Sequence, residues 1–396
     1  MSTPLEASMR FAGIDVGSQT HVLAIVDETC QVLLRPTSFG EDAPGYDRLF
    51  GLLGSPTDVL VAMEATGHYG KNLFAALTQK TFAAAIINPL RTHRFAQEEL
   101  KRASTDSIDA LSIARFAAQK RPPASPPFDL ALTELRELVR LHGRLTQDFG
   151  DRLRQLHRLV NLGFPEFTRH VHGLGARRAR AILREFPTAE AFRPSCESTL
   201  AELRYDAHHS VGWLLAQTLI GAARVSVGRH HGPAFATQVR FLCEDLDNLQ
   251  PKIRGLESDI EQAVRAYPIT SLLTTITGIG PLTAAHIVAT VGDPARFRHA
   301  ATFAAYVGVV PGTSHSGLWR PGQAPLSRIG HARLRKALWM PTLVAVKHNP
   351  WLRDYYQRLR ERGKKPKVAL VAAMHKLLTA VYSVAKHRRP FQPKTP

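Results

Sequence analysis

Four acidic side chains in the first third of the chain have types and positions that could hold a metal ion. Asp15 lies inside the apolar segment 11–17, and Glu64 ends the apolar segment 58–64. An ionised carboxylate in such a segment is costly unless it is paired or binds a cation. Asp106 and Asp109 are three residues apart, so a helix carries both on one face.

These carboxylates would support phosphoryl-transfer chemistry if they came together. Crowded carboxylates repel one another, and a divalent cation relieves the repulsion. Oxygen-rich sites favour Mg²⁺ or Mn²⁺, and two such ions are the usual arrangement for in-line phosphoryl displacement. Each residue taken alone could also have no role in metal binding. An Asp-x-x-Asp pair on a helix is usually solvated, and Asp15 could face a turn.

A serine-rich loop followed by cations forms a second candidate group. Ser314 and Ser316 lie close together, and Ser327 follows. A serine there could attack a phosphodiester while nearby cations stabilise the charge that develops at phosphorus. Spacing alone does not rank the three serines. The cations are Arg320, Arg328, Arg333, Arg335 and Lys336.

Residues 272–293 predict a helix, a tight turn and a second helix. The turn contains Gly278 and Gly280, and Pro281 begins the second helix. This pattern is typical of a helix-hairpin-helix segment, whose exposed amides and helix N-terminus bind a DNA phosphate. A glycine turn between packed helices also occurs without DNA, so both interpretations remain.

The elements that would position the carboxylates have a recognisable order. Three short strands with turn residues between them predict an antiparallel meander. Two apolar strands then alternate with helices, which is a ribonuclease-H-like order. Asp15 and Glu64 would converge at one edge if their strands were neighbours. The predicted strands are 11–17, 21–27, 31–35, 58–64 and 82–88, and the predicted helices are 44–53, 69–79 and one stretch from 89 to about 120.

Beyond the proline-rich segment 121–128, which reads as a linker, the chain is helical. Apolar residues recur at three- and four-residue spacing over 132–160 and again over 246–264. The two runs could pair as an antiparallel coiled coil, within the chain or between subunits, or simply pack into one helical domain. Residues 163–235 carry no motif that indicates a function.

Composition places the partner among polyanions. The 396 residues include 51 Lys and Arg against 33 Asp and Glu, a formal net charge of +18. Residues 317–396 alone carry 18 basic and two acidic side chains, whereas the first 130 residues are close to neutral. Such an excess indicates nucleic acid or an anionic membrane surface. An apolar content of 44% excludes disorder as the main state.

The cysteines and the apolar windows indicate the compartment. Three cysteines lie far apart without a Cys-x-x-Cys pair, which argues against a disulfide framework or a cysteine zinc site and fits a reduced, cytosolic setting. The N-terminus does not read as a signal peptide. The best apolar window near the C-terminus is interrupted by His375 and Lys376, so we expect no transmembrane helix.

Eight motifs together resemble the IS-one-ten family of insertion-sequence transposases, which are relatives of the Piv invertases. The first half resembles the DEDD motif of the family, and the second half resembles its C-terminal transposase domain. The motifs are Gly13–Gly17, Met63–Tyr69, Thr105–Ala110, Thr277–Ala284, Gly292–Phe297, Phe303–Pro311, His315–Gly317 and Leu334–Leu338.

The resemblance implies an α/β fold followed by α domains. Residues 1–128 would be a RuvC-like nuclease domain, 129–267 a helical coiled-coil region and 268–396 a basic, mainly helical transposase domain. It implies that Asp15, Glu64, Asp106 and Asp109 hold Mg²⁺ and that Ser316 is the nucleophile, in a composite site shared between subunits. Residues 318–321 are bulkier than the family pattern, and Ser314 lies close to Ser316.

The same resemblance implies the activity and the partners. Family members cut and rejoin DNA through a phosphoserine link, assemble as dimers and tetramers, and use a noncoding bridge RNA that pairs with target and donor DNA. We therefore expect a cytoplasmic bacterial protein that associates with the nucleoid and not with a membrane. Two alternatives remain: a Holliday-junction-type metal nuclease in which water attacks, and a non-enzymatic basic protein that binds RNA or DNA.

Overall fold

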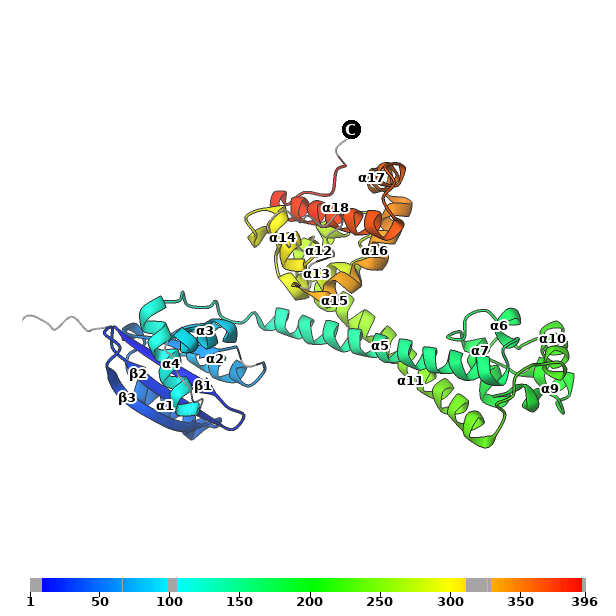
Figure 1. Cartoon of the computed structure of the whole chain (residues 1–396), viewed down its shortest axis with the longest axis horizontal. Coiled ribbons are helices and arrows are strands. Elements are labelled where there is room, and N and C mark those ends of the chain that lie inside the picture. The colour runs from blue at the N-terminus through cyan, green and yellow to red at the C-terminus, as the bar shows by residue number, and fades with distance from the viewer. Residues whose placement is uncertain (1–8, 66, 99–104, 311–325, 327–328, 394–396) are drawn as a thin grey trace, which may run out of the picture. The chain divides into compact units, whose positions relative to one another are not determined.

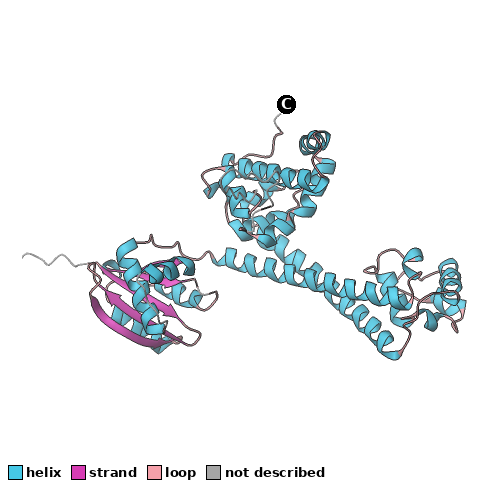
Figure 2. Ribbon diagram, viewed as in Figure 1, coloured by secondary structure: helices cyan, strands magenta, loops and turns pink. Residues whose placement is uncertain are grey.

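The computed structural model describes residues 9–65, 67–98, 105–310, 326 and 329–393. The chain divides into two compact units, Met1–Asp129 and Leu130–Pro396. Every strand that the structure describes lies in the first unit, and the second unit is almost entirely helical (Figure 2). The predicted combination of an α/β part followed by α-helical parts is confirmed at this level.

The first unit is built on a mixed five-stranded sheet with the order β3-β2-β1-β4-β5. The pairs β1–β2 and β2–β3 are antiparallel, whereas β1–β4 and β4–β5 are parallel. The sequence predicted this succession of three antiparallel strands and two further strands. The strands are β1 (Arg10–Val16), β2 (Thr20–Val26), β3 (Val32–Gly40), β4 (Val59–Glu64) and β5 (Ala83–Ile87).

Helices cover both faces of this sheet. Along β1, Ala12 and Ile14 pack into the core beneath α1 (Ala43–Leu53) and α2 (Gly70–Gln79). Phe11 packs on the opposite face, against α3 (Pro89–Glu98) and α4 (Asp106–Lys120). This alternation follows from the period of two in a strand. The single helical stretch expected from 89 to 120 is instead two helices, α3 (Pro89–Glu98) and α4 (Asp106–Lys120).

The proline-rich segment after α4 does not hang free as a linker. The Ser125 amide donates a hydrogen bond to the Ala84 carbonyl at 2.8 Å, and the Ile86 amide donates to Ser125 Oγ at 3.0 Å. The Phe128 ring lies 4.7 Å from the ring of Phe74. The segment therefore covers the edge strand β5, whose backbone groups would otherwise be unpaired.

Two long helices run side by side in the second unit (Figure 1). They are α5 (Leu130–Gly163) and α11 (Pro233–Val264), and they contain the two predicted apolar runs. Arg152 Nε lies 2.8 Å from Asp245 Oδ2, and His142 Nε2 lies 3.4 Å from Glu257 Oε1. The two helices pair within one chain, which is one of the alternatives that the sequence left open.

A small helical subdomain connects the two long helices. We call residues 164–232 the distal lobe. Its core contains Phe164, Phe167 and Phe192, all fully buried, together with residues from α5 and α11. This core is distinct from the hydrophobic core of the C-terminal helices. Its helices are α6 (Phe167–His170), α7 (Arg177–Glu185), α8 (Ala189–Phe192), α9 (Glu197–Glu202) and α10 (Trp213–Arg224).

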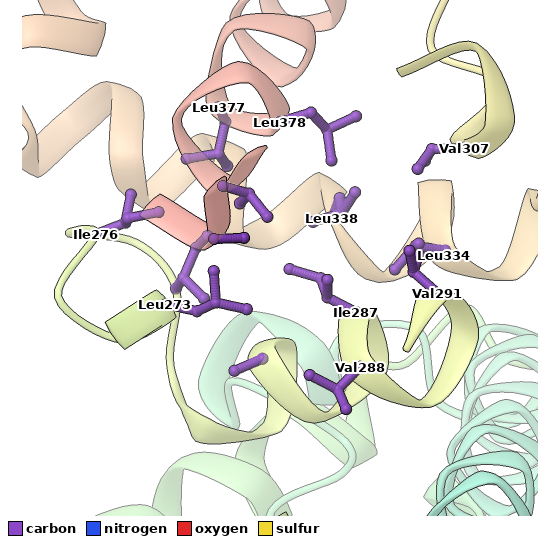
Figure 3. Packing of buried hydrophobic residues seen from close by; sticks show 14 of the residues in the cluster. Leu273, Ile276, Ile287, Val288, Val291, Val307, Leu334, Leu338, Leu377 and Leu378 are labelled. Carbon is purple, nitrogen blue, oxygen red and sulfur yellow. The ribbon is translucent and has the colours of Figure 1, made fainter. Parts of the chain in front are cut away.

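The C-terminal helices form a separate core around α18 (Figure 3). Leu377 and Leu378 of α18 are completely buried and face residues of the surrounding helices. By length and mean hydropathy, 1.6, α18 could cross a membrane, but 56% of its most apolar window is buried, as in the core helix of a globular domain. The helices are α12 (Pro268–Leu273), α13 (Pro281–Val291), α14 (Ala300–Val307), α15 (Ala332–Ala337), α16 (Trp339–His348), α17 (Pro350–Glu361) and α18 (Pro366–His387).

Candidate active site

Asp15 and Glu64 lie at the same edge of the sheet. The neighbouring strands β1 and β4 are parallel, and Ile14 pairs with Met63, so the next residue on each strand is one of the two acids. Alternation also gives them a common face, because Phe11 and Ala62 both pack toward α3 and α4. Two carboxylates 49 positions apart in the sequence therefore converge.

The first turn of α4 brings the other two acids to this face. The Thr105 side chain caps the helix by accepting a hydrogen bond from the Ile108 amide at 3.4 Å, and Asp106 and Asp109 follow in the first turn. Carboxylates are stabilised there by the positive end of the helix dipole. Thr105 itself has extended backbone, so α4 begins as a separate helix after it.

Gly13 allows α4 to approach β1 closely. A Cβ atom at this position would lie 2.2 Å from the Ala114 amide nitrogen and 2.3 Å from the Ala110 carbonyl oxygen. No side chain fits in that space, so the residue must be glycine. The contact fixes the height of α4 over β1, the strand that carries Asp15.

The electrostatics of Asp15 show that the four acids interact. Its pKa is raised from 3.8 to about 6, chiefly by burial and then by the negative charges of Asp106, Asp109 and Glu64. Burial and like charge both disfavour the ionised form. All four residues singled out in the sequence therefore belong to one electrostatic cluster.

A cavity of about 460 Å³ opens beside this cluster, and Glu64 and Asp109 both line it. Thr92 and His93 of α3 line it as well, and sequence reasoning missed both. The buried Thr92 hydroxyl lies 2.5 Å from Glu64 Oε1 and orients that carboxylate. The available signal was their position just beyond β5, whose carboxyl end lies at the same sheet edge as those of β1 and β4.

The donor chemistry of the cluster fits a hard divalent cation. All four side chains offer oxygen, and the raised pKa of Asp15 reports a repulsion that a cation would relieve. No three His, Cys, Asp or Glu side chains in the described residues are already gathered closely enough to hold an ion.

Comparisons with known proteins agree with this geometry. Residues 12–165 match a DEDD-type family model described as "Transposase", and residues 270–357 match the model described as "Transposase IS116/IS110/IS902 family". The chain belongs to this family of transposases.

Relatives of this transposase match it over most of its length. The "Pilin gene-inverting protein" of Moraxella lacunata is 26% identical over 83% of this chain and 80% of that protein. The "Mini-circle putative transposase for IS117" of Streptomyces coelicolor is 28% identical over 96% of this chain and 95% of that protein. Family membership establishes a recombinase that acts on DNA and suggests the use of a divalent metal.

The glycine turn of the transposase has a packing role at one of its two glycines. Gly278 has φ +105°, and a Cβ there would lie 2.6 Å from Ala345 Cβ in α16. Ile279 is buried, whereas nothing lies within 4 Å of a Cβ at Gly280, the residue that precedes α13. Of the two glycines, only Gly280 leaves room for a ligand at the start of α13.

Only some of the predicted cations, and none of the predicted serines, lie among the residues that the structure describes. The Arg335 guanidinium donates a hydrogen bond to the Val307 carbonyl at 3.1 Å and so is held by the protein itself, whereas Arg333 and Lys336 are exposed. The others lie outside the described residues: Ser314, Ser316, Arg320, Ser327 and Arg328.

Proposed function

We propose that this transposase cuts and rejoins DNA through a covalent serine–DNA intermediate. In this proposal Ser316 is the nucleophile, and Asp15, Glu64, Asp106 and Asp109 hold Mg²⁺ or Mn²⁺ in a RuvC-like nuclease domain. The main support is the carboxylate cluster at the edge of β1 and β4, where the pKa of Asp15 is raised to about 6. The motif His315–Gly317 supports the choice of serine.

The proposed step exchanges one phosphoester bond for another. Ser316 Oγ loses its proton and forms a bond to phosphorus, while the bond from phosphorus to a deoxyribose oxygen breaks and that oxygen takes up a proton. Reversal with a different deoxyribose hydroxyl rejoins the strand. The phosphoserine conserves the bond energy, so no external energy source is needed.

The carboxylate cluster has a separate role in this chemistry. Asp15, Glu64, Asp106 and Asp109 are the residues that would hold the divalent cation, and Thr92 keeps the Glu64 carboxylate oriented. A cation held there would neutralise charge on a phosphate in the transition state.

The decisive experiment compares serine variants. Wild-type protein incubated with substrate DNA and Mg²⁺ should give a protease-sensitive DNA–protein adduct on a denaturing gel. Ser316→Ala should abolish both the adduct and strand cleavage, whereas Ser314→Ala should retain them. Cleavage without an adduct in the wild-type protein would instead support a Holliday-junction-type nuclease. An adduct in Ser316→Ala would overturn the choice of nucleophile.

We also propose the partners of the reaction. They are target and donor DNA and a noncoding bridge RNA, bound by a homodimer or homotetramer on the bacterial nucleoid in the cytoplasm. The excess of basic residues beyond position 316 supports a polyanionic partner. RNA sequenced from the purified protein should map beside its own gene. Recovery of only bulk cellular RNA would contradict the proposal that a bridge RNA guides the protein.

A further inference from the structure

The distal lobe carries a small cationic pocket beside α7. We propose that this pocket binds the phosphodiester backbone of a nucleic acid strand, as a contact point separate from the carboxylate cluster. The cavity has a volume of about 220 Å³. Its lining residues are Arg177, Ala181, Arg184, Arg204, Tyr205 and Asp247.

The arrangement of the arginines follows from helix geometry. Arg177, Ala181 and Arg184 are four and three residues apart on α7, so they form one face of that helix. The small Ala181 between the two arginines leaves the floor of the pocket open. Arg204 approaches from another segment of the lobe, the strand-like bridge between residues 204 and 210.

Asp247, the single acid that lines the pocket, is already paired with the buried Arg180. Asp247 of α11 accepts a hydrogen bond from Arg180 Nε at 2.7 Å, and the Arg180 side chain is almost fully buried. Arg180 also donates to Gln250 Oε1 at 2.8 Å. Arg180 is therefore a structural residue, because it is buried and hydrogen-bonded to Asp247 and Gln250. Since Arg180 already neutralises the one acid of the pocket, the three lining arginines carry an excess of positive charge.

Two of the rim arginines are available for a ligand. Arg184 shares Asp247 at 3.2 Å, but Arg177 and Arg204 are exposed and make no ion pair with any described residue. Holding unpaired cations around one concavity is unfavourable because they repel one another, and an anion relieves that repulsion. The guanidinium fork matches the geometry of phosphate oxygens.

The turn that presents Arg204 and Tyr205 is held in place. Asp206 Oδ1 accepts hydrogen bonds from the His208 and His209 amides at 2.9 and 2.8 Å. The Tyr205 and His209 rings stack with centroids 5.9 Å apart. A fixed turn loses little conformational entropy when a ligand binds. Tyr205 also supplies an aromatic face or a hydroxyl next to the cations.

The size of the pocket favours a polymer over a metabolite. Pockets that enclose small-molecule ligands usually measure roughly 300–1,000 Å³. A smaller open cationic cavity suits one phosphate group of a strand that continues across the surface. Phosphate contacts of this kind fix the position of a protein on nucleic acid without reading its sequence.

Binding measurements on the full-length protein test the proposal without any cleavage step, so they do not depend on the proposed serine chemistry. The double variant Arg177→Gln/Arg204→Gln is compared with Arg224→Gln, an exposed arginine of the same lobe outside the pocket. The probes are a fluorescent random-sequence DNA duplex and a fluorescent RNA hairpin. Affinities are measured over a series of salt concentrations.

The pocket variant should bind at least one of the two probes about five- to tenfold more weakly, and its slope of log K against log salt should be shallower by about 1 to 2. Loss confined to the duplex identifies DNA as the ligand, and loss confined to the hairpin identifies RNA. Arg204→Lys should keep the salt slope because it keeps the charge. Affinities and slopes equal to those of Arg224→Gln on both probes would overturn the proposal.

A second measurement covers the case in which the double variant does not fold. Wild-type protein is cross-linked to each probe with ultraviolet light and digested. The peptide that contains Tyr205 should carry a nucleotide adduct with the probe that occupies the pocket. Adducts confined to residues outside the distal lobe would overturn the proposal.

Discussion

The carboxylate cluster is assembled at the expense of stability. Asp15 is partly buried and lies within the electrostatic field of three other acids, all on the α3 and α4 face of the sheet. A residue chosen for stability alone would be uncharged there. Such unfavourable charge is typical of functional sites, where perturbed pKa values concentrate.

Removal of the Asp15 charge should therefore stabilise the protein while it destroys activity. Because the folded-state pKa, about 6, exceeds the ordinary value of 3.8, the free energy of unfolding falls as pH rises from about 4 through 6. Asp15→Asn should raise the free energy of unfolding at pH 7.5 without divalent metal by about 1 kcal/mol, after allowance for solvent screening of a half-exposed group. Chemical denaturation of both proteins in the presence of EDTA measures this difference in the free energy of unfolding.

The exposed Asp47 on α1 provides the matched control for that experiment. Asp47→Asn should leave the free energy of unfolding unchanged both at pH 7.5 and near pH 3.5. The gain in Asp15→Asn should be largely lost near pH 3.5, where the wild-type carboxyl is protonated in the folded state and mostly protonated in the unfolded state. Equal stability of Asp15→Asn and wild type at pH 7.5 would show that the cluster does not carry the repulsion inferred here.

Thr92 should act on the site through Glu64, although its hydroxyl also lies 3.0 Å from the Pro89 carbonyl oxygen. Thr92→Val keeps the shape of the side chain but leaves Glu64 without the hydroxyl donor at 2.5 Å. Loss of a group that orients a metal ligand typically costs ten- to a hundredfold in metal affinity or activity. We expect a drop of about that size in Mg²⁺ affinity measured by calorimetry, with recovery in Thr92→Ser. Unchanged affinity in Thr92→Val would remove Thr92 from the site.

At the scale of elements, apolar runs and their spacing predicted the existence of the five strands and the two long helices, but not all of their ends. β3 continues to Gly40, beyond the predicted 31–35, and α11 begins at Pro233, before the predicted run 246–264. The same patterns also placed Asp15 at a strand and Glu64 at a strand end, and parallel pairing then explains their convergence. Thr92 and His93 were not found in this way, because periodicity marks neither as a site residue. Their position just beyond β5 was the available signal, and the packing of α3 decides that they line the cavity. The edge contact of Ser125 is likewise a tertiary hydrogen bond inside a segment that reads as a linker.

Gly13 is the position where one added atom should disturb the site. A Cβ there would meet the backbone of α4 at 2.2 Å, and backbone cannot rotate away as a side chain can. Overpacking of this kind typically costs about 1–3 kcal/mol or more. Gly13→Ala should lower the denaturation midpoint and abolish DNA cleavage, because α4 carries Asp106 and Asp109.

Gly51 supplies the matched control for Gly13. It lies within α1, and nothing lies within 4 Å of a Cβ built there. Alanine is preferred over glycine inside a helix, so Gly51→Ala should leave stability unchanged or raise it by up to about 1 kcal/mol. A loss of stability in both variants would mean that the close approach of α4 to β1 is not the cause.

At the scale of the whole molecule, charge and chemistry are separated along the chain. The first 130 residues are close to neutral and include the four acids of the candidate metal site, whereas residues 317–396 carry 18 basic and two acidic side chains. Arg353 and Arg358 of α17 are exposed and have no acidic partner among the residues that the structure describes. Such side chains are available to replace the counterions of a nucleic acid.

The salt dependence of DNA binding should therefore depend on the C-terminal cations. Each phosphate that the protein neutralises on duplex DNA contributes about −0.9 to the slope of log K against log salt. Arg353→Gln/Arg358→Gln should make the slope shallower by close to 2, whereas the exposed pair Arg35→Gln/Arg48→Gln in the first unit should not change it. Anisotropy titrations of one duplex between low and moderate salt measure both variants. Equal changes in the two pairs would mean that the C-terminal charge excess is not the DNA-binding surface.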